Sequence, residues 1–301
     1  MICSHKLKTK VAQYGKTSLF QCCSCNLIYS NKYKKKFDPR LLYRNYYKTE
    51  SQGRFKFFLE DIIKIFRFFR AFKIFTIYPR AKSILDIGCG RGQMLYYLKK
   101  YYHYGTVGTQ LDQRALDYAR KKLGLKIFNK DLLKIGFKKK SFDVVSLWHV
   151  LEHIKTPQHY LKKINFLLNK NGFLVIEVPN FNSWTSYISK GYWLGLDLDY
   201  HLNFFTPSSL SKIISNNGFN IKRIHTFSLE YSTFISVQSL VSRITRTDQL
   251  VFNWLQDKKF QPAIVFHLFL FILLTPICFF INLFLYFSKK GEVLLLIACK
   301  K

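Results

Sequence analysis

Acidic residues are scarce in this sequence. Only 17 Asp and Glu stand against 48 Lys and Arg among 301 residues, which gives a formal net charge of +31. A codon bias toward lysine would also raise glutamate, so the deficit of acids indicates a physical role. A field of this sign attracts anionic lipid surfaces, phosphorylated substrates or nucleic acid.

The sequence also lacks a disulfide framework, an internal repeat and an apolar run at its beginning. Four of the seven cysteines precede Asn26, and the other three are scattered. The first residues contain no apolar core of a signal peptide, so we expect the catalytic part in the cytoplasm, where thiols stay reduced. The length suffices for one large domain with appendages.

An apolar run over 84–87 is followed by glycines at alternate positions, Gly88, Gly90 and Gly92. The run is typical of a buried parallel strand, and glycines allow the backbone to turn sharply and approach a ligand closely. A helix is predicted from Gln93. A dinucleotide-binding turn requires glycine where Gln93 stands, which argues against NAD.

The pattern D-x-G-x-G-x-G over 86–92 resembles motif I of the class I S-adenosylmethionine (SAM) dependent methyltransferases. The resemblance extends over 83–227, through strands predicted at 106–111, 125–129, 142–147, 173–178 and 219–227 and the segments 148–153 and 200–210. It implies an α/β fold, a Rossmann-like doubly wound seven-stranded methyltransferase sheet. Its antiparallel last strand is expected at 292–299.

The resemblance also implies SAM as cofactor and a set of residues lining its pocket. Gln110 stands where the family has an acid that holds the ribose, Asp112 is a possible substitute, and Asp131 matches the acid beside the adenine. For Asp86, direct contact and orientation of the turn amides both stay open. The implied cofactor-binding residues are Asp86, Gly88, Cys89, Gly90, Gln110, Asp131, Leu132 and Trp148.

Three histidines are candidate catalytic bases for a hydroxyl acceptor, because neutral imidazole titrates near working pH. His201 lies in a predicted loop and is the first candidate, and His149 is the second. His153 is expected rather to fix its own segment through a hydrogen bond. The alternation of Asp197, Asp199 and His201 is compatible with a cation site, but a solvated loop is the preferred interpretation.

The segment Cys22-x-x-Cys25 resembles the second knuckle of a zinc ribbon that precedes some bacterial methyltransferases. Two thiolates at this spacing suit tetrahedral zinc. The first knuckle is degenerate, because Lys6 follows Cys3 where a cysteine is needed, so Cys3 and His5 would have to complete the set. Two interpretations stay open: structural zinc on Cys3, Cys22 and Cys25, or a ribbon held by β pairing alone.

A second feature outside the core is an almost wholly apolar tract over 263–287. At about 1.5 Å per residue it can cross a bilayer core of roughly 30 Å. Pro276 lies near its middle, lysines flank both ends, and a core strand is predicted after it. We therefore expect a re-entrant or in-plane helical hairpin that turns at Pro276, with a single transmembrane span as the alternative.

The segment 54–75 is predicted to be a basic amphipathic helix. It is expected to contact a membrane, to cover the cofactor site with a solvated basic stripe, or to do both. The predicted division of the chain is a degenerate zinc-ribbon-like segment, a basic aromatic linker with the amphipathic helix, a SAM-binding core, a membrane-associated helical insertion and a final core strand. The corresponding ranges are 1–35, 36–82, 83–230, 231–290 and 291–301.

The sequence thus predicts a membrane-associated SAM-dependent methyltransferase acting on a hydroxyl of a glycan, a lipid-linked molecule or another amphipathic acceptor. Alternatives are an isoprenoid-quinone O- or C-methyltransferase and a non-catalytic membrane scaffold with a decayed methyltransferase fold. Nucleic acid is not expected as a partner, because an RNA methyltransferase would leave the apolar tract unexplained and no RNA-binding module is present.

Overall fold

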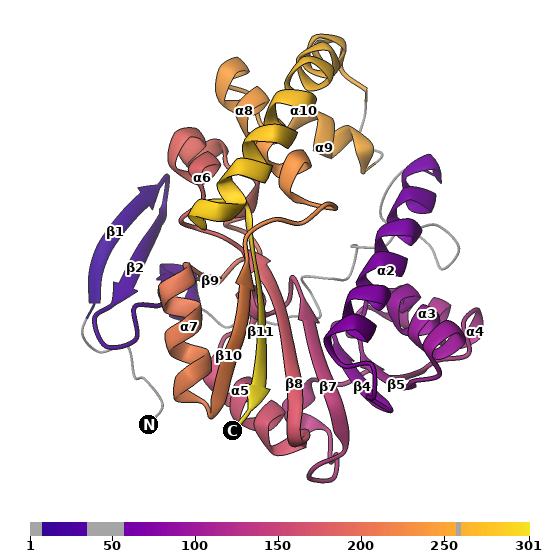
Figure 1. Cartoon of the computed structure of the whole chain (residues 1–301). Helices are drawn as coiled ribbons and strands as arrows, with labels where there is room; N and C mark the ends of the chain where they lie inside the picture. The colour runs from indigo at the N-terminus through magenta and orange to yellow at the C-terminus, as the bar shows by residue number, and fades with distance from the viewer. Residues whose placement is uncertain (1–7, 35–56, 257–259) are drawn as a thin grey trace.

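A seven-stranded sheet forms the centre of the molecule in the computed structural model, which describes residues 8–34, 57–256 and 260–301 (Figure 1). Its order is β10-β11-β8-β7-β4-β5-β6, and β4 to β8 pair in parallel. Strand β11 lies antiparallel between β8 and β10, as predicted. The strands are β4 (Ser83–Ile87), β5 (Gly105–Thr109), β6 (Lys126–Phe128), β7 (Phe142–Trp148), β8 (Leu168–Pro179), β10 (Phe219–His225) and β11 (Val293–Lys300).

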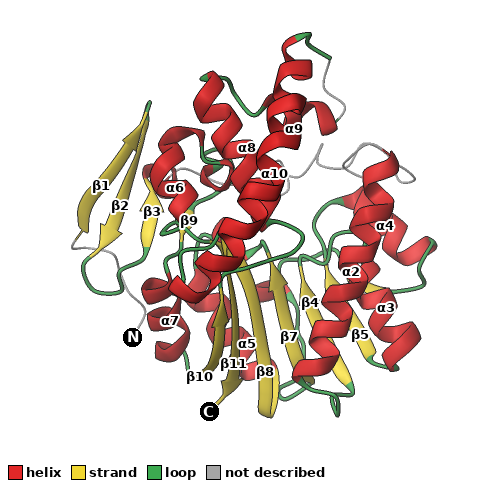
Figure 2. Cartoon of the chain, turned by 45° about the horizontal axis from the view of Figure 1, so that its top comes forward, coloured by secondary structure: helices red, strands yellow, loops and turns green. Residues whose placement is uncertain are grey.

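Helices cover both faces of the sheet (Figure 2). Side chains alternate between the faces along each strand, so Ile84 packs in one cluster and Leu85 in the other. Each fully buried aliphatic side chain contributes about 1.5–3 kcal/mol relative to an exposed one. One face carries α2 (Phe57–Ile77), α3 (Gln93–Tyr102) and α4 (Gln113–Lys121), and the other α5 (Pro157–Leu167) and α7 (Pro207–Asn216).

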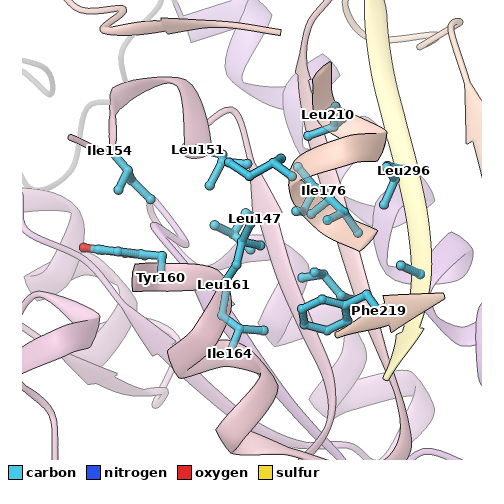
Figure 3. Close-up of a cluster of buried hydrophobic side chains, with 14 of the residues drawn as sticks. Leu147, Leu151, Ile154, Tyr160, Leu161, Ile164, Ile176, Leu210, Phe219 and Leu296 are labelled. Atoms are coloured by element: carbon cyan, nitrogen blue, oxygen red, sulfur yellow. The ribbon is translucent and has the colours of Figure 1, made fainter. Parts of the chain in front are cut away.

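A cluster of buried hydrophobic side chains lies between the sheet and helices α5 and α7 (Figure 3). Leu147, Ile176 and Leu296 come from three neighbouring strands and are at most 1% exposed. Tyr160 packs against this cluster while its phenol oxygen points away from the labelled aliphatic side chains. A polar group is thereby carried by a packed helix to the border of the core.

A small N-terminal sheet docks on a loop of the main domain. It contains β1 (Lys8–Tyr14), β2 (Thr17–Cys22) and β3 (Ile28–Ser30), and β3 pairs with β9 (Asn203–Phe204). The Ser30 amide also donates to the Leu202 carbonyl at 3.0 Å. The segment is thus β-paired, as one of the two sequence interpretations requires, and this pairing holds the segment that contains His201.

The apolar tract forms one continuous helix, α10 (Ala263–Ser288), with Pro276 inside it. The predicted hairpin turn at Pro276 is wrong. Side chains on both sides of the proline, Ile264, Cys278 and Asn282 among them, are buried. Packing of α10 on α8 (Ser232–Thr245) thus keeps both arms in line despite the missing hydrogen bond. Helices α6 (Trp184–Ser189) and α9 (Leu250–Leu255) complete this group.

Smaller predictions shift at their boundaries. Strand β8 begins at Leu168 rather than at residue 173, and its register against β7 jumps between Phe142 and Val144. The extra residues of β8 form a bulge at this point, and the strand continues on both sides of it. Strand β10 ends at His225 rather than at Phe227.

Candidate active site

The glycine turn after β4 has the backbone geometry that its sequence predicts. Gly88, Gly90 and Gly92 adopt φ values of 70°, 56° and 77°, in the left-handed region. A Cβ on Gly88 would lie 2.6 Å from a methyl carbon of Val150. The Cys89 amide donates to the Thr109 carbonyl at 3.0 Å, which ties the turn to β5. The turn therefore requires glycine at position 88 for two independent reasons.

Asp86 is a buried carboxyl beneath this turn. Its Oδ1 accepts a hydrogen bond from the Ser146 hydroxyl at 2.7 Å, from the neighbouring strand β7. Burial raises the pKa of Asp86 to about 7, although Ser146 and the more distant Arg70 and Arg67 oppose the shift. The carboxyl group thus changes charge near neutral pH.

The carboxyl end of β5 presents Gln110 in place of an acid. The Gln110 side-chain oxygen accepts from the amides of Leu111 and Asp112 at 2.7 and 3.2 Å, so its amide nitrogen is the group that can donate outward. Asp112 caps α4, because its Oδ1 accepts from the Ala115 amide at 2.8 Å. The Gln110 amide nitrogen, unlike the capping oxygen of Asp112, is therefore not used by the turn itself.

The carboxyl ends of β6 and β7 add an acid and an indole. Asp131 accepts from the Leu133 amide at 2.9 Å and from the Tyr160 hydroxyl, which fixes its carboxylate. Leu132 beside it is 1% exposed. The buried Trp148 Nε1 has no hydrogen-bond partner among the described residues. A buried donor of this kind is costly unless a ligand or water pairs with it.

One cavity of about 1180 Å³ joins these groups, and all of the predicted cofactor-binding and catalytic residues line it. Its volume exceeds the roughly 300–1,000 Å³ of a pocket for one drug-sized ligand, so a cofactor and an acceptor both have room. The predicted residues on its wall are Asp86, Gly88, Cys89, Gly90, Gln110, Asp131, Leu132, Trp148, His149, His153 and His201.

His149 lies between two buried carboxylates. Its Nε2 is 3.1 Å from Glu177 Oε1, and its Nδ1 is 3.5 Å from Glu152 Oε1. Burial opposes the positive charge, but the two carboxylates outweigh it and raise the pKa of His149 to about 9. Its backbone has a φ of 54°, a strained conformation for a residue with a Cβ. At neutral pH this imidazole is a cation, which makes it a poor base.

His153 and His201 differ from His149, because burial lowers the pKa of both rings against the opposing field of Glu152. His201 Nδ1 lies 3.0 Å from the Gly195 carbonyl, and His153 Nδ1 lies 3.0 Å from the Tyr200 carbonyl. A proton on each Nδ1 completes these hydrogen bonds and leaves each Nε2 as an acceptor. His201 Nε2 is 4.0 Å from Glu152 Oε1.

Glu152 connects the three rings. It is 1% exposed, and neither carboxylate oxygen has a hydrogen-bond partner among the described residues. One ligand atom each from Glu152, His153 and His201 lie within 4.8 Å of one another. Burial opposes the charge, but the histidines lower the pKa of Glu152, so it is ionised. Asp197 and Asp199 are not in this group, and Asp199 pairs with Lys32 at 2.8 Å.

Helix α2 closes the cavity with an inward basic edge. Arg70 Nη2 lies 2.9 Å from Glu230 and 3.4 Å from Glu177, and its guanidinium lies 4.6 Å from the centroid of Trp148. Arg67 contacts Glu230 at 2.6 Å. The prediction of a solvated basic stripe is wrong for these two arginines, because the buried Glu177 and the partly buried Glu230 face them from distant segments. That α2 covers the site holds, while residues 54–56 lie outside the described part.

Sequence reasoning missed Glu177, Glu230 and the role of Glu152. A charged residue inside the apolar strand 173–178 was the available signal for Glu177, since an acid in a buried strand needs a partner. Burial opposes its charge, but His149 and Arg70 lower the pKa of Glu177 to about 2. No pattern in the sequence connects Glu230 with Arg67, because the pairing depends on the fold.

The cysteine knuckle forms a tight turn. The Asn26 amide donates to the Cys22 carbonyl at 2.9 Å, and Cys22 and Cys25 are buried. Cys3, the third predicted ligand, lies outside the described residues, so the set of three stays a prediction. In the described part the one group of three candidate metal ligands is Glu152, His153 and His201.

A family model for a methyltransferase domain matches residues 61–224, more than half of the chain. The chain belongs to this methyltransferase family. A relative, the ubiquinone biosynthesis O-methyltransferase of Pelagibacter ubique (strain HTCC1062), is 28% identical over 188 residues, 57% of this chain and 73% of the relative. The probable (S)-tetrahydroprotoberberine N-methyltransferase 2 of Papaver bracteatum is 29% identical over 104 residues, 32% of this chain and 28% of the relative.

Solved structures share the fold of this methyltransferase. A crystal structure of a SAM-dependent methyltransferase from Archaeoglobus fulgidus has a TM-score of 0.52 and 18% identity, covering 87% of this chain and 100% of that one. A putative sarcosine dimethylglycine methyltransferase from Galdieria sulphuraria has a TM-score of 0.51 and 11% identity, covering 79% of this chain and 86% of that one.

The protein is a SAM-dependent methyltransferase, and its residues fit that cofactor. The glycine turn lies at the carboxyl edge of the parallel strands, where ligands bind in open α/β sheets. The Asp86 carboxylate can pair with a cation, and the Gln110 amide can donate to a hydroxyl. The unpaired Trp148 Nε1 can donate to an acceptor on a ligand. The family match ends before α8, α9 and α10.

Proposed function

We propose that this methyltransferase transfers a methyl group to a hydroxyl of an amphipathic acceptor, such as a lipid-linked molecule or glycan, at a cytoplasmic membrane surface. The observation that carries the proposal is the cavity itself. The same cavity is lined by the glycine turn, by the histidine cluster and by Phe271 and Thr275 of the apolar helix α10.

When bound, SAM supplies an electrophilic methyl group attached to a sulfonium. In the proposal, ionised Asp86 holds a cationic group of the cofactor, the Gln110 amide donates to its ribose, and Asp131 lies beside its adenine. Helix α2 excludes water from this end, because Arg67 and Arg70 hold it over the cavity through Glu230. In-line displacement depends on such alignment and exclusion of water.

His201 is the proposed base for the acceptor hydroxyl. Its Nδ1 hydrogen bond to Gly195 orients the ring, and its lowered pKa keeps Nε2 able to take a proton. The resulting imidazolium would be stabilised by Glu152, whose ionised carboxylate lies 4.0 Å away. His149 retains its own proton at neutral pH and instead compensates the charges of Glu152 and Glu177.

Two features support the membrane as the place of reaction. Helix α10 is the one helix among the described residues that is long and apolar enough to cross a membrane, and only 17% of its most apolar window is buried. Its last turn is followed by Lys289 and Lys290, and the chain carries a charge of +31. Apolar surface bordered by positive charge is typical of proteins that bind anionic lipid surfaces.

The test is transfer of a radiolabelled methyl group from SAM to membrane lipid extracts, with product separated by polarity. We expect a labelled lipid-soluble product from the wild-type chain, a loss of at least 100-fold for His201→Ala, and unchanged transfer for His159→Ala on the exposed face of α5. Full turnover of His201→Ala at saturating acceptor would reject the proposed base. Label confined to water-soluble products would reject the acceptor class.

A second acceptor class is a hydroxylated isoprenoid quinone precursor. The observation that favours it is the 28% identity to the Pelagibacter protein named as a ubiquinone biosynthesis O-methyltransferase. Synthetic prenylated catechols distinguish the two: methylation of these compounds supports the quinone class, and methylation of a polar lipid-linked glycan alone supports the first.

The zinc ribbon stays a proposal, and metal content of the purified chain below a third of an equivalent would reject it.

A further inference from the structure

We propose that α8, α9 and α10 form a binding site for the hydrocarbon chain of the acceptor, continuous with the methyl-transfer site. The inference rests on the proposed function in one respect, since it assigns the acceptor an apolar chain. All three helices lie beyond the matched methyltransferase domain.

The wall that α8, α9 and α10 contribute to the cavity carries aromatic and aliphatic side chains. They are Phe234 and Ile235 of α8, Phe252 and Leu255 of α9, and Phe271 of α10. The Phe234 ring lies 5.5 Å from Phe271 and 6.1 Å from Phe252, centroid to centroid, so the three helices meet at one aromatic cluster. Polar residues within and beside α9 also line the cavity: Asp248, Gln249, Asn253 and Gln256.

The wall that the matched domain contributes to the same cavity is polar. Asp86, Glu152 and His201 line it. A molecule that places a hydroxyl at His201 therefore extends its other end toward the cluster of Phe234, Phe252 and Phe271. An amphipathic molecule with a polar head and a hydrocarbon chain matches this order.

Helix α10 separates the cavity from an apolar outer surface. A stripe with the spacing of one helix face, Ile264, His267, Cys278 and Asn282, is buried against the protein. His267 Nε2 lies 2.8 Å from the Thr247 hydroxyl, and Asn282 donates to the Ser236 hydroxyl at 2.9 Å. These polar anchors fix which face of the helix points inward.

The rest of α10 is exposed and apolar. Phe269, Ile272, Phe280 and Phe284 are between 61% and 75% exposed. Thr275 both lines the cavity and is exposed at the surface. In Figure 1, α8, α9 and α10 lie together beyond the ends of the central strands. A chain in the cavity thus has a path to a bilayer that holds the outer face.

Photolabelling tests this assignment with a defined probe. Palmitic acid carrying a terminal diazirine, in phosphatidylglycerol vesicles, is irradiated with the full chain and S-adenosylhomocysteine, and labelled residues are mapped. We expect label on α8 and α9 at Phe234, Ile235 and Phe252 in addition to α10. Unlabelled fatty acids should compete better with length, by up to about fourfold for each methylene buried (about 0.8 kcal/mol).

Matched variants on one helix separate the cavity from the outer surface. Phe271→Gln, at the cavity, should reduce label on α8 and α9 by at least fivefold, whereas Phe269→Gln, on the exposed face, should leave it unchanged. If Phe271→Gln does not fold, Phe234→Leu takes its place. Label confined to the exposed face of α10, or equal effects of the two variants, would overturn the assignment.

The readout is independent of methyl transfer. Chain labelling within the cavity without any methylated lipid product would uphold the site and reject the proposed acceptor hydroxyl. Methylated lipid without label on α8 or α9 would uphold the proposed function and reject the site. Binding of S-adenosylhomocysteine, measured in the same preparations, verifies that each variant retains the folded domain.

Discussion

Burial favours the neutral form of two titratable residues of this methyltransferase, Asp86 and His149, but it prevails over the neighbouring groups only at Asp86. Asp86 has one hydroxyl donor and distant arginines, so desolvation prevails and raises its pKa to about 7. His149 has two adjacent carboxylates, and their attraction prevails over desolvation. One residue therefore gains a proton near neutral pH and the other retains it up to about pH 9.

The first prediction concerns Asp86 and the binding of S-adenosylhomocysteine. If the carboxylate holds the amino acid ammonium of the ligand, binding requires loss of the proton, so affinity falls as pH falls through about 7. Between pH 8 and pH 6 the ionised fraction drops about tenfold, and the dissociation constant should rise by about that factor. Calorimetry at the two pH values measures it.

The control is Asp86→Asn, which should bind more weakly and show no such change between pH 6 and 8. A wild-type dissociation constant that stays constant over this range would show that Asp86 does not contact the ligand charge and only supports β7 through Ser146.

The second prediction concerns His149 and stability. Its folded pKa of about 9 exceeds the unfolded value of about 6.5, so its contribution is complete below pH 6.5 and is lost as pH rises to 9. The thermal midpoint should therefore fall between pH 7 and pH 9 by more than about 2 °C. In His149→Gln this part of the fall should disappear, and equal slopes in both proteins would contradict the assigned ion contacts.

For single residues, the sequence identified glycines and acids that come together on the wall of one cavity, because strand ends have a fixed place in the fold. It did not locate Glu177 or Glu230, whose partners Arg70 and Arg67 are more than 100 residues away. Sequence spacing carries no information on such pairs. His201 and Glu152 came together for the same reason, through the docking of the β9 loop.

Among the elements, the beginning of β11 links the core to the added helices. Glu292 is fully buried and accepts hydrogen bonds from Trp193 Nε1 and Ser236 Oγ at 3.1 Å each and from Ser183 Oγ at 3.4 Å. Ser236 in turn accepts from Asn282 of α10. A single carboxyl group thus joins β11, α6, α8 and the loop that lines the cavity.

The third prediction is that Glu292→Leu destabilises the protein through this junction. Each buried donor left unpaired costs about 1–3 kcal/mol, so we expect the thermal midpoint to fall by at least about 4 °C. Leu294→Ala, elsewhere on β11, is the comparison for lost packing alone. We expect only Glu292→Leu to lower the rate of methyl transfer while the affinity for S-adenosylhomocysteine stays the same. Equal rates of methyl transfer in Glu292→Leu and Leu294→Ala would show that the junction has no special role.

The elements themselves were largely predictable where periodicity and turn residues agreed, as in β4, α3 and the antiparallel β11. Helix α10 was not, because Pro276 alone indicates a break. The contacts that hold the helix on both sides of the proline, Cys278 and Asn282 against α8 among them, are tertiary. A helix can continue through proline where neighbouring elements hold both arms.

For the whole molecule, the position of α10 limits how it can meet a membrane. The strand that follows it lies inside the main sheet, between β8 and β10, and α8 before it packs on α10. Both ends of α10 therefore belong to the same side, which favours a helix lying in the plane of the membrane over a span. The basic composition of the sequence carries no information on this geometry.

The fourth prediction is that the protein binds anionic vesicles through α10. Phe280→Glu with Phe284→Glu should weaken binding to phosphatidylglycerol vesicles at least tenfold, because two exposed apolar side chains lose their insertion. Phe166→Glu, an exposed aromatic on α5, should have little effect. Cosedimentation measures both, and equal losses would place the contact elsewhere or reduce it to charge alone.

The most direct test of the central claim is calorimetric titration of S-adenosylhomocysteine into the detergent-solubilised full chain, with Gly88→Ala alongside. We expect saturable binding in the micromolar range for the wild-type chain. For Gly88→Ala we expect an affinity at least tenfold lower, because its Cβ would meet Val150 in a left-handed turn. Absence of binding by demonstrably folded wild-type protein would contradict the assignment of this cavity to the cofactor.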